Sequence, residues 1–108
     1  MQITITDENF KREVLDSDLP VIVECSANWS GTSEIIKPVI YKILLKYENQ
    51  VKFGILDIDI EKNTILQYGI KNAPAVLLFN KGQLQEYLSG VFSFRDLEFL
   101  ISQYIKNE

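Results

Sequence analysis

Two kinds of apolar pattern alternate along the chain. Short apolar runs, typical of strands, occupy residues 2–6, 20–27, 51–58, 75–79 and 83–88. Between them, apolar residues recur every three or four positions, which is typical of helices: after residue 7, over 33–48, over 61–68 and after residue 93. The pattern therefore predicts the element order βαβαβαββα.

Capping residues mark the ends of several predicted helices. Thr6 and Asp7 can cap the first helix, and Ser93, with Asp96 three residues later, can cap the last. Gly69 is a typical residue for the end of the third helix. The last helix is expected to bury one apolar face, which carries Leu97, Leu100, Ile101, Tyr104 and Ile105.

The same pattern predicts an α/β fold with a mixed sheet. Strands that alternate with helices require crossover connections, so part of the sheet should be parallel. The turn at 80–82 predicts an antiparallel hairpin at the end of the sheet. Helices should cover both faces, and Pro38 should kink the longest of them. We expect a single domain over residues 1–108.

Charge and length restrict the partners. The 108 residues carry a net charge of −4 without a block of like charge. This argues against nucleic acids and anionic membranes, which favour basic patches. No apolar run approaches the ~20 residues of a membrane helix, and the first residues do not resemble an export signal. We therefore expect a soluble, cytoplasmic, monomeric protein.

The supply of reactive side chains is small. The chain has no histidine, which excludes a Ser-His-Asp or Cys-His site within it and removes the commonest metal ligand. It has one cysteine, Cys25, so no internal disulfide can form. Because Cys25 lies in a predicted buried strand beside Glu24, we expect an inert thiol. We expect no metal and no cofactor.

Two segments carry a family resemblance. The first is VIVECSANWSGTS at 21–33, followed by Pro38, and the second is YGIKNAPAVLLF at 68–79. Together with Lys81-Gly82 and Gly90, they resemble the thioredoxin family in register over most of the chain. The resemblance implies the thioredoxin fold and a cis proline at Pro74. It also implies the family activity, protein-disulfide reduction by a Cys-x-x-Cys pair in cell redox homeostasis.

The reactive positions depart from that family. Ser30 and Ser33 stand where the resemblance places the two redox cysteines, and Thr32 replaces the proline between them. A serine hydroxyl stays protonated at neutral pH and cannot form the mixed disulfide on which exchange depends. Ser30 and Ser33 could instead form a hydroxyl nucleophile pair, but Glu24 is the only nearby base. Capping and helix-start roles are favoured.

Glu24 occupies the position of the family's buried acid. The family's neighbouring lysine falls on Ile55, and Cys25 replaces an aromatic residue. A carboxylate buried without a cation is unfavourable, so we expect a raised pKa at Glu24.

Three functions stay open. The first is a redox-inactive domain, of chaperone-like, scaffolding or stabilising type, that binds extended protein segments without covalent capture. Its groove would be formed by Trp29, Gly31, Thr32, Ala73, Pro74, Ser89 and Gly90. The second is a thioredoxin-type protein disulfide reductase whose two cysteines were changed to serine by engineering. Thr32, Ile55 and Cys25 argue for natural loss instead. The third is a homo-oligomeric scaffold built on an apolar patch around Trp29.

Overall fold

Nine helices and strands make up the part of the chain that the computed structural model describes, residues 2–27 and 33–105. Their bounds are β1 (Gln2–Ile5), η1 (Lys11–Leu15), β2 (Val21–Ser26), α1 (Ser33–Lys46), β3 (Lys52–Asp57), α2 (Lys62–Tyr68), β4 (Ala75–Asn80), β5 (Gln83–Ser89) and α3 (Phe94–Ser102). This order confirms the predicted βαβαβαββα pattern. The first helix, η1, is a short π-type segment rather than an α-helix.

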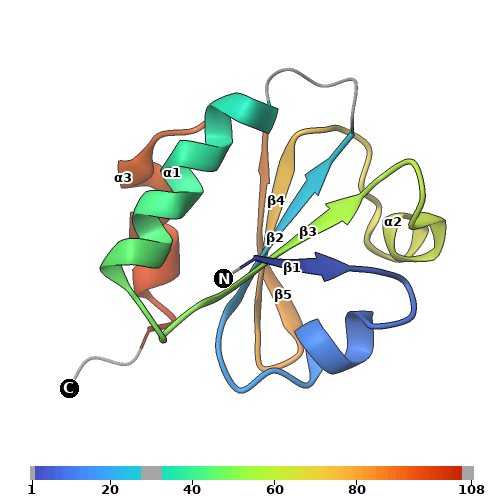
Figure 1. The fold of residues 1–108 in the computed structure, drawn as a ribbon, viewed down its shortest axis with the longest axis horizontal. Helices are drawn as coiled ribbons and strands as arrows, with labels where there is room; N and C mark the ends of the chain where they lie inside the picture. The colour runs from blue at the N-terminus through green and yellow to red at the C-terminus, as the bar shows by residue number, and fades with distance from the viewer. Residues whose placement is uncertain (1, 28–32, 106–108) are drawn as a thin grey trace.

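The five strands form one mixed sheet in the order β1-β3-β2-β4-β5. Strands β1, β3 and β2 are parallel, whereas β4 runs antiparallel to β2, and β5 antiparallel to β4. Helices α1 and α3 lie on one side of the sheet, and η1 and α2 lie on the other (Figure 1). The predicted mixed sheet with helices on both faces is thus confirmed.

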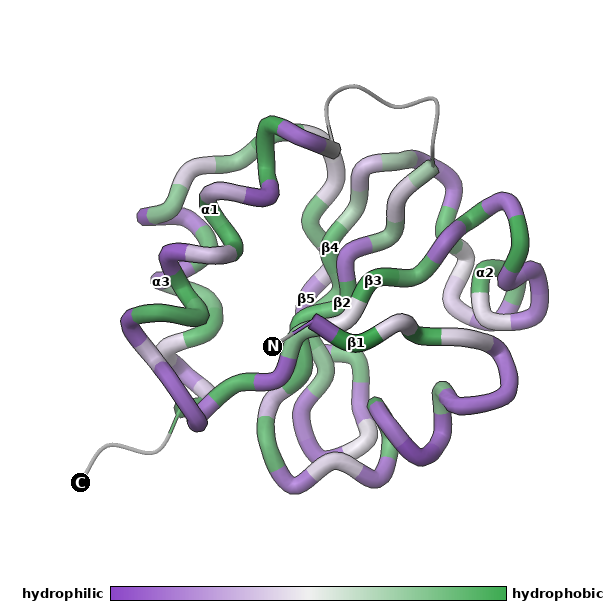
Figure 2. The backbone as a smooth tube through the Cα atoms, viewed as in Figure 1, coloured by the Kyte–Doolittle hydropathy of each residue, from purple (hydrophilic) through white to green (hydrophobic). Residues whose placement is uncertain are grey.

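Strand alternation divides the buried side chains between the two faces. Val21, Val23 and Cys25 of β2 pack with residues of η1 and α2. Ile22 of the same strand packs with Ile36 of α1 and with other apolar residues of α1 and α3. Figure 2 shows the resulting apolar segments through the centre of the sheet. Because consecutive residues of a strand point to opposite faces, the central strand serves both cores.

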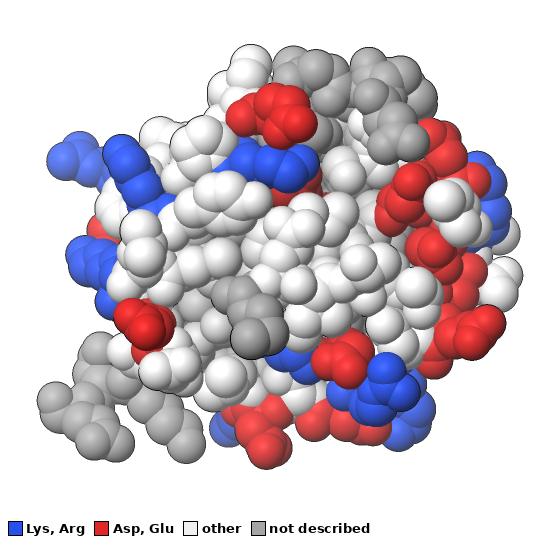
Figure 3. Space-filling model, viewed as in Figure 1, with Lys and Arg blue, Asp and Glu red and all other residues white. Residues whose placement is uncertain are grey.

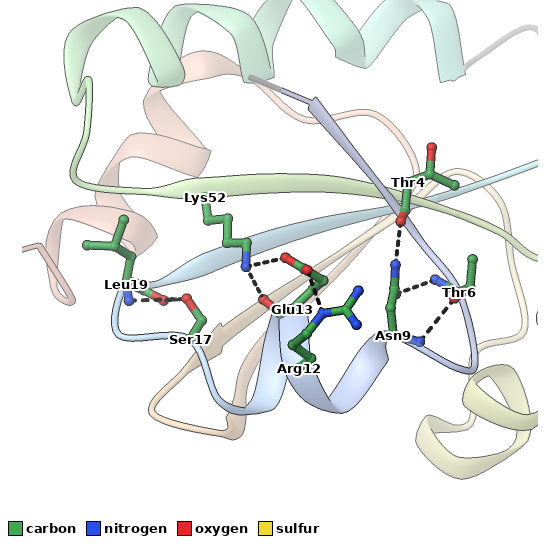
Figure 4. Close-up of polar contacts among 8 residues, drawn as sticks. All are labelled: Thr4, Thr6, Asn9, Arg12, Glu13, Ser17, Leu19 and Lys52. Carbon is green, nitrogen blue, oxygen red and sulfur yellow. Dashed lines mark hydrogen bonds and ion pairs between the residues drawn. The ribbon is translucent and has the colours of Figure 1, made fainter.

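The turn before η1 is closed by Thr6 and Asn9. The backbone N–H of Asn9 donates to Thr6 Oγ1 at 3.0 Å, and the backbone N–H of Thr6 donates to Asn9 Oδ1 at 2.7 Å. The Asn9 side chain also donates to the Thr4 carbonyl at 2.9 Å (Figure 4). The predicted cap is therefore only partly correct: Thr6 closes a turn, and η1 begins later, at Lys11, without a side-chain cap.

Asp7 caps a different helix from the one predicted. Its Oδ1 accepts from the backbone N–H and the hydroxyl of Thr64, at 2.9 and 2.7 Å, and its Oδ2 accepts from the Asn63 N–H at 3.1 Å. In return, the Asp7 N–H donates to Glu61 Oε1 at 2.9 Å. The Thr64 hydroxyl and the two backbone N–H groups lower the pKa of Asp7, which outweighs its partial burial. Asp7 thus ties the N-terminal turn to the start of α2.

Lys52 fastens η1 to the start of β3. Its Nζ donates to the Glu13 carbonyl at 2.6 Å and lies 2.8 Å from Glu13 Oε1 (Figure 4). Arg12 contacts the same carboxylate at 3.0 Å. Lys52 and Arg12 lower the pKa of Glu13 by hydrogen bonding and charge.

The hairpin and helix ends follow their local signals with one exception. Lys81 and Gly82 both have positive φ, at 53° and 79°, as a two-residue hairpin loop of type I′ requires. Gly69 ends α2 in the left-handed conformation, at φ 63°. Ser93 and Asp96 form the predicted capping box. Helix α3, however, ends at Ser102.

The apolar face predicted for the last helix is buried only in part. Leu97 and Ile101 are fully buried, and Leu100 is half-buried. Tyr104 and Ile105 lie beyond the end of the helix, although Ile105 still packs against the core. Pro38 lies inside α1, which continues past it. Within the described residues, no helix has the length and apolar character needed to cross a bilayer.

Candidate functional site

The ends of four strands meet at one edge of the sheet, beside the start of α1. Ser26, at the end of β2, is the register partner of Asp57, at the end of β3. On the other side of β2, Cys25 is opposite Ala75, the first residue of β4. Ala75 is in turn opposite Ser89, the last residue of β5. This edge therefore gathers backbone from four strands.

Four predicted partner-binding residues lie together at this edge. Ala73 and Pro74 immediately precede β4, and the peptide bond between them is cis. The Pro74 carbonyl accepts from the Gly90 N–H at 3.1 Å, which joins this segment to the residue after Ser89. Gly90 has φ of 82°, a conformation that favours glycine. Ala73, Pro74, Ser89 and Gly90 thus form one corner, here named the Pro74 corner.

The other predicted groove residues, Trp29, Gly31 and Thr32, lie outside the described residues. Ser30, at one of the redox-cysteine positions, lies outside them as well. Ser33 is the first residue of α1. The proposed groove therefore has one described wall, the Pro74 corner.

Glu24 lies fully buried in β2, as predicted, but it is not without a cation. Its Oε2 is 3.4 Å from Nζ of Lys37, on α1. The side chain of Lys37 is 24% exposed, and its Nζ also lies 3.6 Å from Oε2 of Glu34. The expectation of an unpaired acid was wrong, because a lysine on a covering helix replaces one on the neighbouring strand.

The pair does not fully compensate the burial of Glu24. Burial raises the pKa of Glu24 above its ordinary value, and the nearby charge of Lys37 opposes this rise only in part. Among the described residues, Oε1 of Glu24 has no hydrogen-bond partner. The predicted rise in pKa is confirmed, and its main cause is desolvation.

Cys25 faces away from Glu24. It packs with the apolar residues on the η1 and α2 side and is fully buried. Burial, and to a smaller extent the charge of Glu24, raises the pKa of this thiol to about 12. A thiol with that pKa carries almost no thiolate at neutral pH, which supports the prediction of an inert cysteine.

Lys37 is the polar residue of this edge that the sequence pattern did not single out. Its neighbour Ile36 and Ile40, three positions after it, are both fully buried, so Lys37 lies at the border of the buried face of α1. That position, with Glu34 three residues before it, is the signal that could have identified it. In residues 2–27 and 33–105 no group of three His, Cys, Asp or Glu side chains could hold a metal.

One hollow of the described surface lies away from this corner. It measures about 690 Å³ and is bordered by Pro20, Gln50, Asn80 and Tyr104, among others. Pro20 and Gln50 precede β2 and β3, and Asn80 ends β4. This hollow is therefore at the opposite end of the sheet from the Pro74 corner.

Comparison with known proteins gives one consistent result. The family model described as thioredoxin matches residues 1–103. A thioredoxin of Synechocystis is 36% identical over 101 residues, which covers 94% of each chain. A thioredoxin of Rickettsia conorii is 36% identical over 91 residues, covering 84% of this chain and 87% of its own. Thioredoxin 1 of Nostoc is 37% identical over 86 residues, 80% of each chain.

The burial of Cys25 predicts slow thiol chemistry. In the folded protein, Cys25 should react with 5,5′-dithiobis(2-nitrobenzoate) far more slowly than it does in 6 M guanidinium chloride, where every thiol is accessible. The two rates can be compared by absorbance. A rapid, stoichiometric reaction of the native protein at pH 7 would contradict the burial of this thiol.

Because Lys37 compensates the burial of Glu24 only in part, we predict that Glu24→Leu stabilises the fold. At pH 7 we expect its free energy of unfolding to exceed that of the wild type by about 1 kcal/mol, because an ion pair with a desolvated member is replaced by an apolar side chain. Lys37 is left partly exposed and beside Glu34, so it does not become a buried, isolated charge. Urea denaturation measures the difference.

The way in which the free energy of unfolding changes with pH shows whether the charge of Glu24, rather than its packing, determines the effect. Because the pKa of Glu24 is raised in the folded state, the native protein binds more protons than the unfolded chain above pH 4.5, the ordinary value. Wild-type stability from this group is therefore present below that pH and is lost as the pH rises through the folded pKa. Glu24→Gln keeps the shape of the side chain without its charge. Over the same pH range, its free energy of unfolding should therefore rise relative to that of the wild type. Equal stability of all three proteins at pH 7 would refute the argument.

Proposed function

The chain belongs to the thioredoxin family, and from this premise we propose that it binds extended segments of other proteins at the Pro74 corner without exchanging electrons with them. The role would be of a chaperone-like, scaffolding or stabilising kind. The proposal places the protein in the cytoplasm, as a monomer whose partner is a protein or peptide segment.

The arrangement of backbone at the Pro74 corner supports binding of an extended chain. Ala73 lies two residues before the start of β4, and no backbone hydrogen bond given among the described residues uses its N–H or carbonyl. An incoming segment could pair with these groups as an added strand does. Trp29, Gly31 and Thr32 are assigned to the facing wall by the sequence alone.

The sequence supports the absence of electron transfer. With Ser30 and Ser33 at the expected positions of the redox cysteines, the chain has one sulfhydryl, Cys25. Cys25 is buried on the side of the sheet opposite Glu24, and its pKa of about 12 keeps it protonated. A partner held at the Pro74 corner would therefore be bound and released without a mixed disulfide.

A polypeptide partner also suits the charge of the molecule better than a nucleic acid does. On the face shown in Figure 3, acidic side chains gather on the side of the molecule where α2 lies. The net charge of −4 has the same sign. Nucleic-acid binding favours a basic surface.

The second candidate is a thioredoxin-type protein disulfide reductase whose cysteines were changed to serine. The comparisons favour this function over natural loss of activity, because the relatives are all called thioredoxin and match most of the chain. Thr32, Ile55 and Cys25 favour natural loss, because removal of two redox cysteines gives no reason to alter these positions as well. The codons at 30 and 33 in the source gene decide directly between the two origins.

Introducing cysteines at positions 30 and 33 tests whether the domain can still act as a disulfide reductase. We expect insulin reduction by the chain in dithiothreitol to proceed at the rate of the reagent blank, since neither serine can form a mixed disulfide. The matched variant Ser30→Cys/Ser33→Cys should stay well below an authentic thioredoxin if the site has diverged. Turbidity of the released insulin chains measures both rates.

Either result of that experiment is informative. A rate above the blank for the unchanged chain would contradict the absence of electron transfer. Full activity of the Ser30→Cys/Ser33→Cys variant would support the reductase function, because it would show that the site needs only the two cysteine thiols to be active.

Binding can be tested without knowing the natural partner. We expect reduced, carboxymethylated α-lactalbumin, a soluble unfolded chain, to shift the NMR amide signals of Ala73, Ser89 and Gly90. The signals of Lys81 and Gly82, in the hairpin loop at the other end of β5, serve as the internal control. Trp29→Ala should weaken the shifts while leaving the folded spectrum intact. Shifts of equal size at both ends of the sheet, or no shifts, would refute binding at the Pro74 corner.

A further inference from the structure

The burial of Glu24 requires a compensating charge, and the sheet does not provide one. Its register partners are Ile55 on β3 and Val76 on β4, which are both apolar. In a parallel pair, register partners lie on the same face, so Ile55 is the cross-strand neighbour of the carboxylate. A cation for Glu24 must therefore come from the helices that cover this face.

Lys37 is the cation within reach of Glu24 among the described residues. It lies on α1, and its Nζ is 3.4 Å from Glu24 Oε2 and 3.6 Å from Glu34 Oε2. Glu34 belongs to the first turn of α1, whereas Glu24 is on β2. In Figure 3, a basic and an acidic side chain adjoin where α1 begins. The lysine thus joins the first turn of the helix to the centre of the sheet.

We propose that Lys37 is a positioning residue: it is the counter-cation of Glu24, and through this contact the ionisation of a buried acid in β2 sets the position of the first turn of α1. In the sequence, that turn follows directly on the segment that holds Trp29, Gly31 and Thr32, which the proposed function assigns to the groove. The proposal itself concerns the free protein and does not require a bound partner.

The contact between Lys37 and Glu24 depends on whether Glu24 is ionised. Ionised Glu24 attracts Lys37 in surroundings from which water is excluded, where the attraction is stronger than at the surface. Protonation removes the charge, so Lys37 keeps only its partly exposed neighbour Glu34. The raised pKa of Glu24 brings this change closer to neutral pH than that of an ordinary glutamate.

The charged groups of α3, which packs on the same face, contact other residues or solvent rather than Glu24. On α3, Glu98 binds Lys46 and Tyr47 near the far end of α1, and Asp96 belongs to the cap of its own helix. Arg95, also on α3, is exposed. The groups that govern Glu24 are therefore Lys37, which lowers its pKa, and Glu34, which raises it.

The first experiment follows the carboxyl carbon of Glu24 by ¹³C NMR as the pH is varied. Removal of an opposite charge at this distance changes a pKa by about one unit or more, so Lys37→Met should raise the pKa of Glu24 by that amount. The matched control is Lys42→Met, which removes a lysine from the exposed side of the same helix. Equal effects of the two variants would overturn the assignment of Lys37 as the counter-cation.

The second experiment tests the coupling to α1. In the wild type, the amide signals of Glu34, Ile35 and Ile36 should titrate with the pKa of Glu24, and Lys37→Arg should preserve this response. Lys37→Met should abolish it. In the double variant Lys37→Met/Ile55→Lys, the new cation lies on β3, so the pKa of Glu24 should fall again while the amides of α1 still do not respond.

The coupling can fail in two ways, and both are measurable. Wild-type amides of the first turn that do not follow the titration of Glu24 would overturn the proposal, even if a variant did not fold. A response restored by Ile55→Lys would show that the charge alone matters and that Lys37 does not position the helix. Neither result depends on whether the Pro74 corner binds a partner.

Discussion

The structure depends on one strand that is buried on both faces. Strand β2 is hydrogen-bonded to β3 on one side and to β4 on the other, and all but its last side chain are buried. Both cores are built against it, so its register determines what each face of the sheet presents. A shift of one residue would exchange Glu24 and Cys25 between the two cores and place the acid among the apolar residues of η1 and α2.

This constraint separates the two groups that could have taken part in chemistry. Cys25 lies on the side of η1 and α2, where burial removes its thiolate character. Glu24 lies on the side of α1, where Lys37 can reach it. The carboxylate therefore stays within reach of the start of α1, whereas the thiol is directed away from it. The position of each group follows from strand alternation alone, before any question of function.

Local sequence patterns predicted most of the fold, because alternation, capping and turns each act over a few residues. The strands, the Ser93 capping box and the Lys81-Gly82 turn are of this kind. Apart from the late start of η1 and the early end of α3, the errors concern contacts between distant segments. Asp7 caps α2 rather than the helix beside it, and Lys37 reaches β2 from a neighbouring layer. Such contacts depend on how elements pack, which local pattern does not encode. Of the predicted site, the Pro74 corner could be placed because the sheet brings it together.

Family membership and activity rest on different residues here. An identity of 36–37% is an average over the matched chain, and a shared fold does not by itself fix the chemistry of a site. The positions at which the sequence resemblance predicts a departure in chemistry are few and concentrated: Ser30, Ser33 and Thr32 in one segment, and Ile55 beside the buried acid. A buried acid without a lysine on β3 would be destabilising unless another cation paired with it. Lys37 meets that need from α1. The apolar residue at 55 is thus matched by a cation from another layer, so the fold holds the buried acid without a lysine on β3.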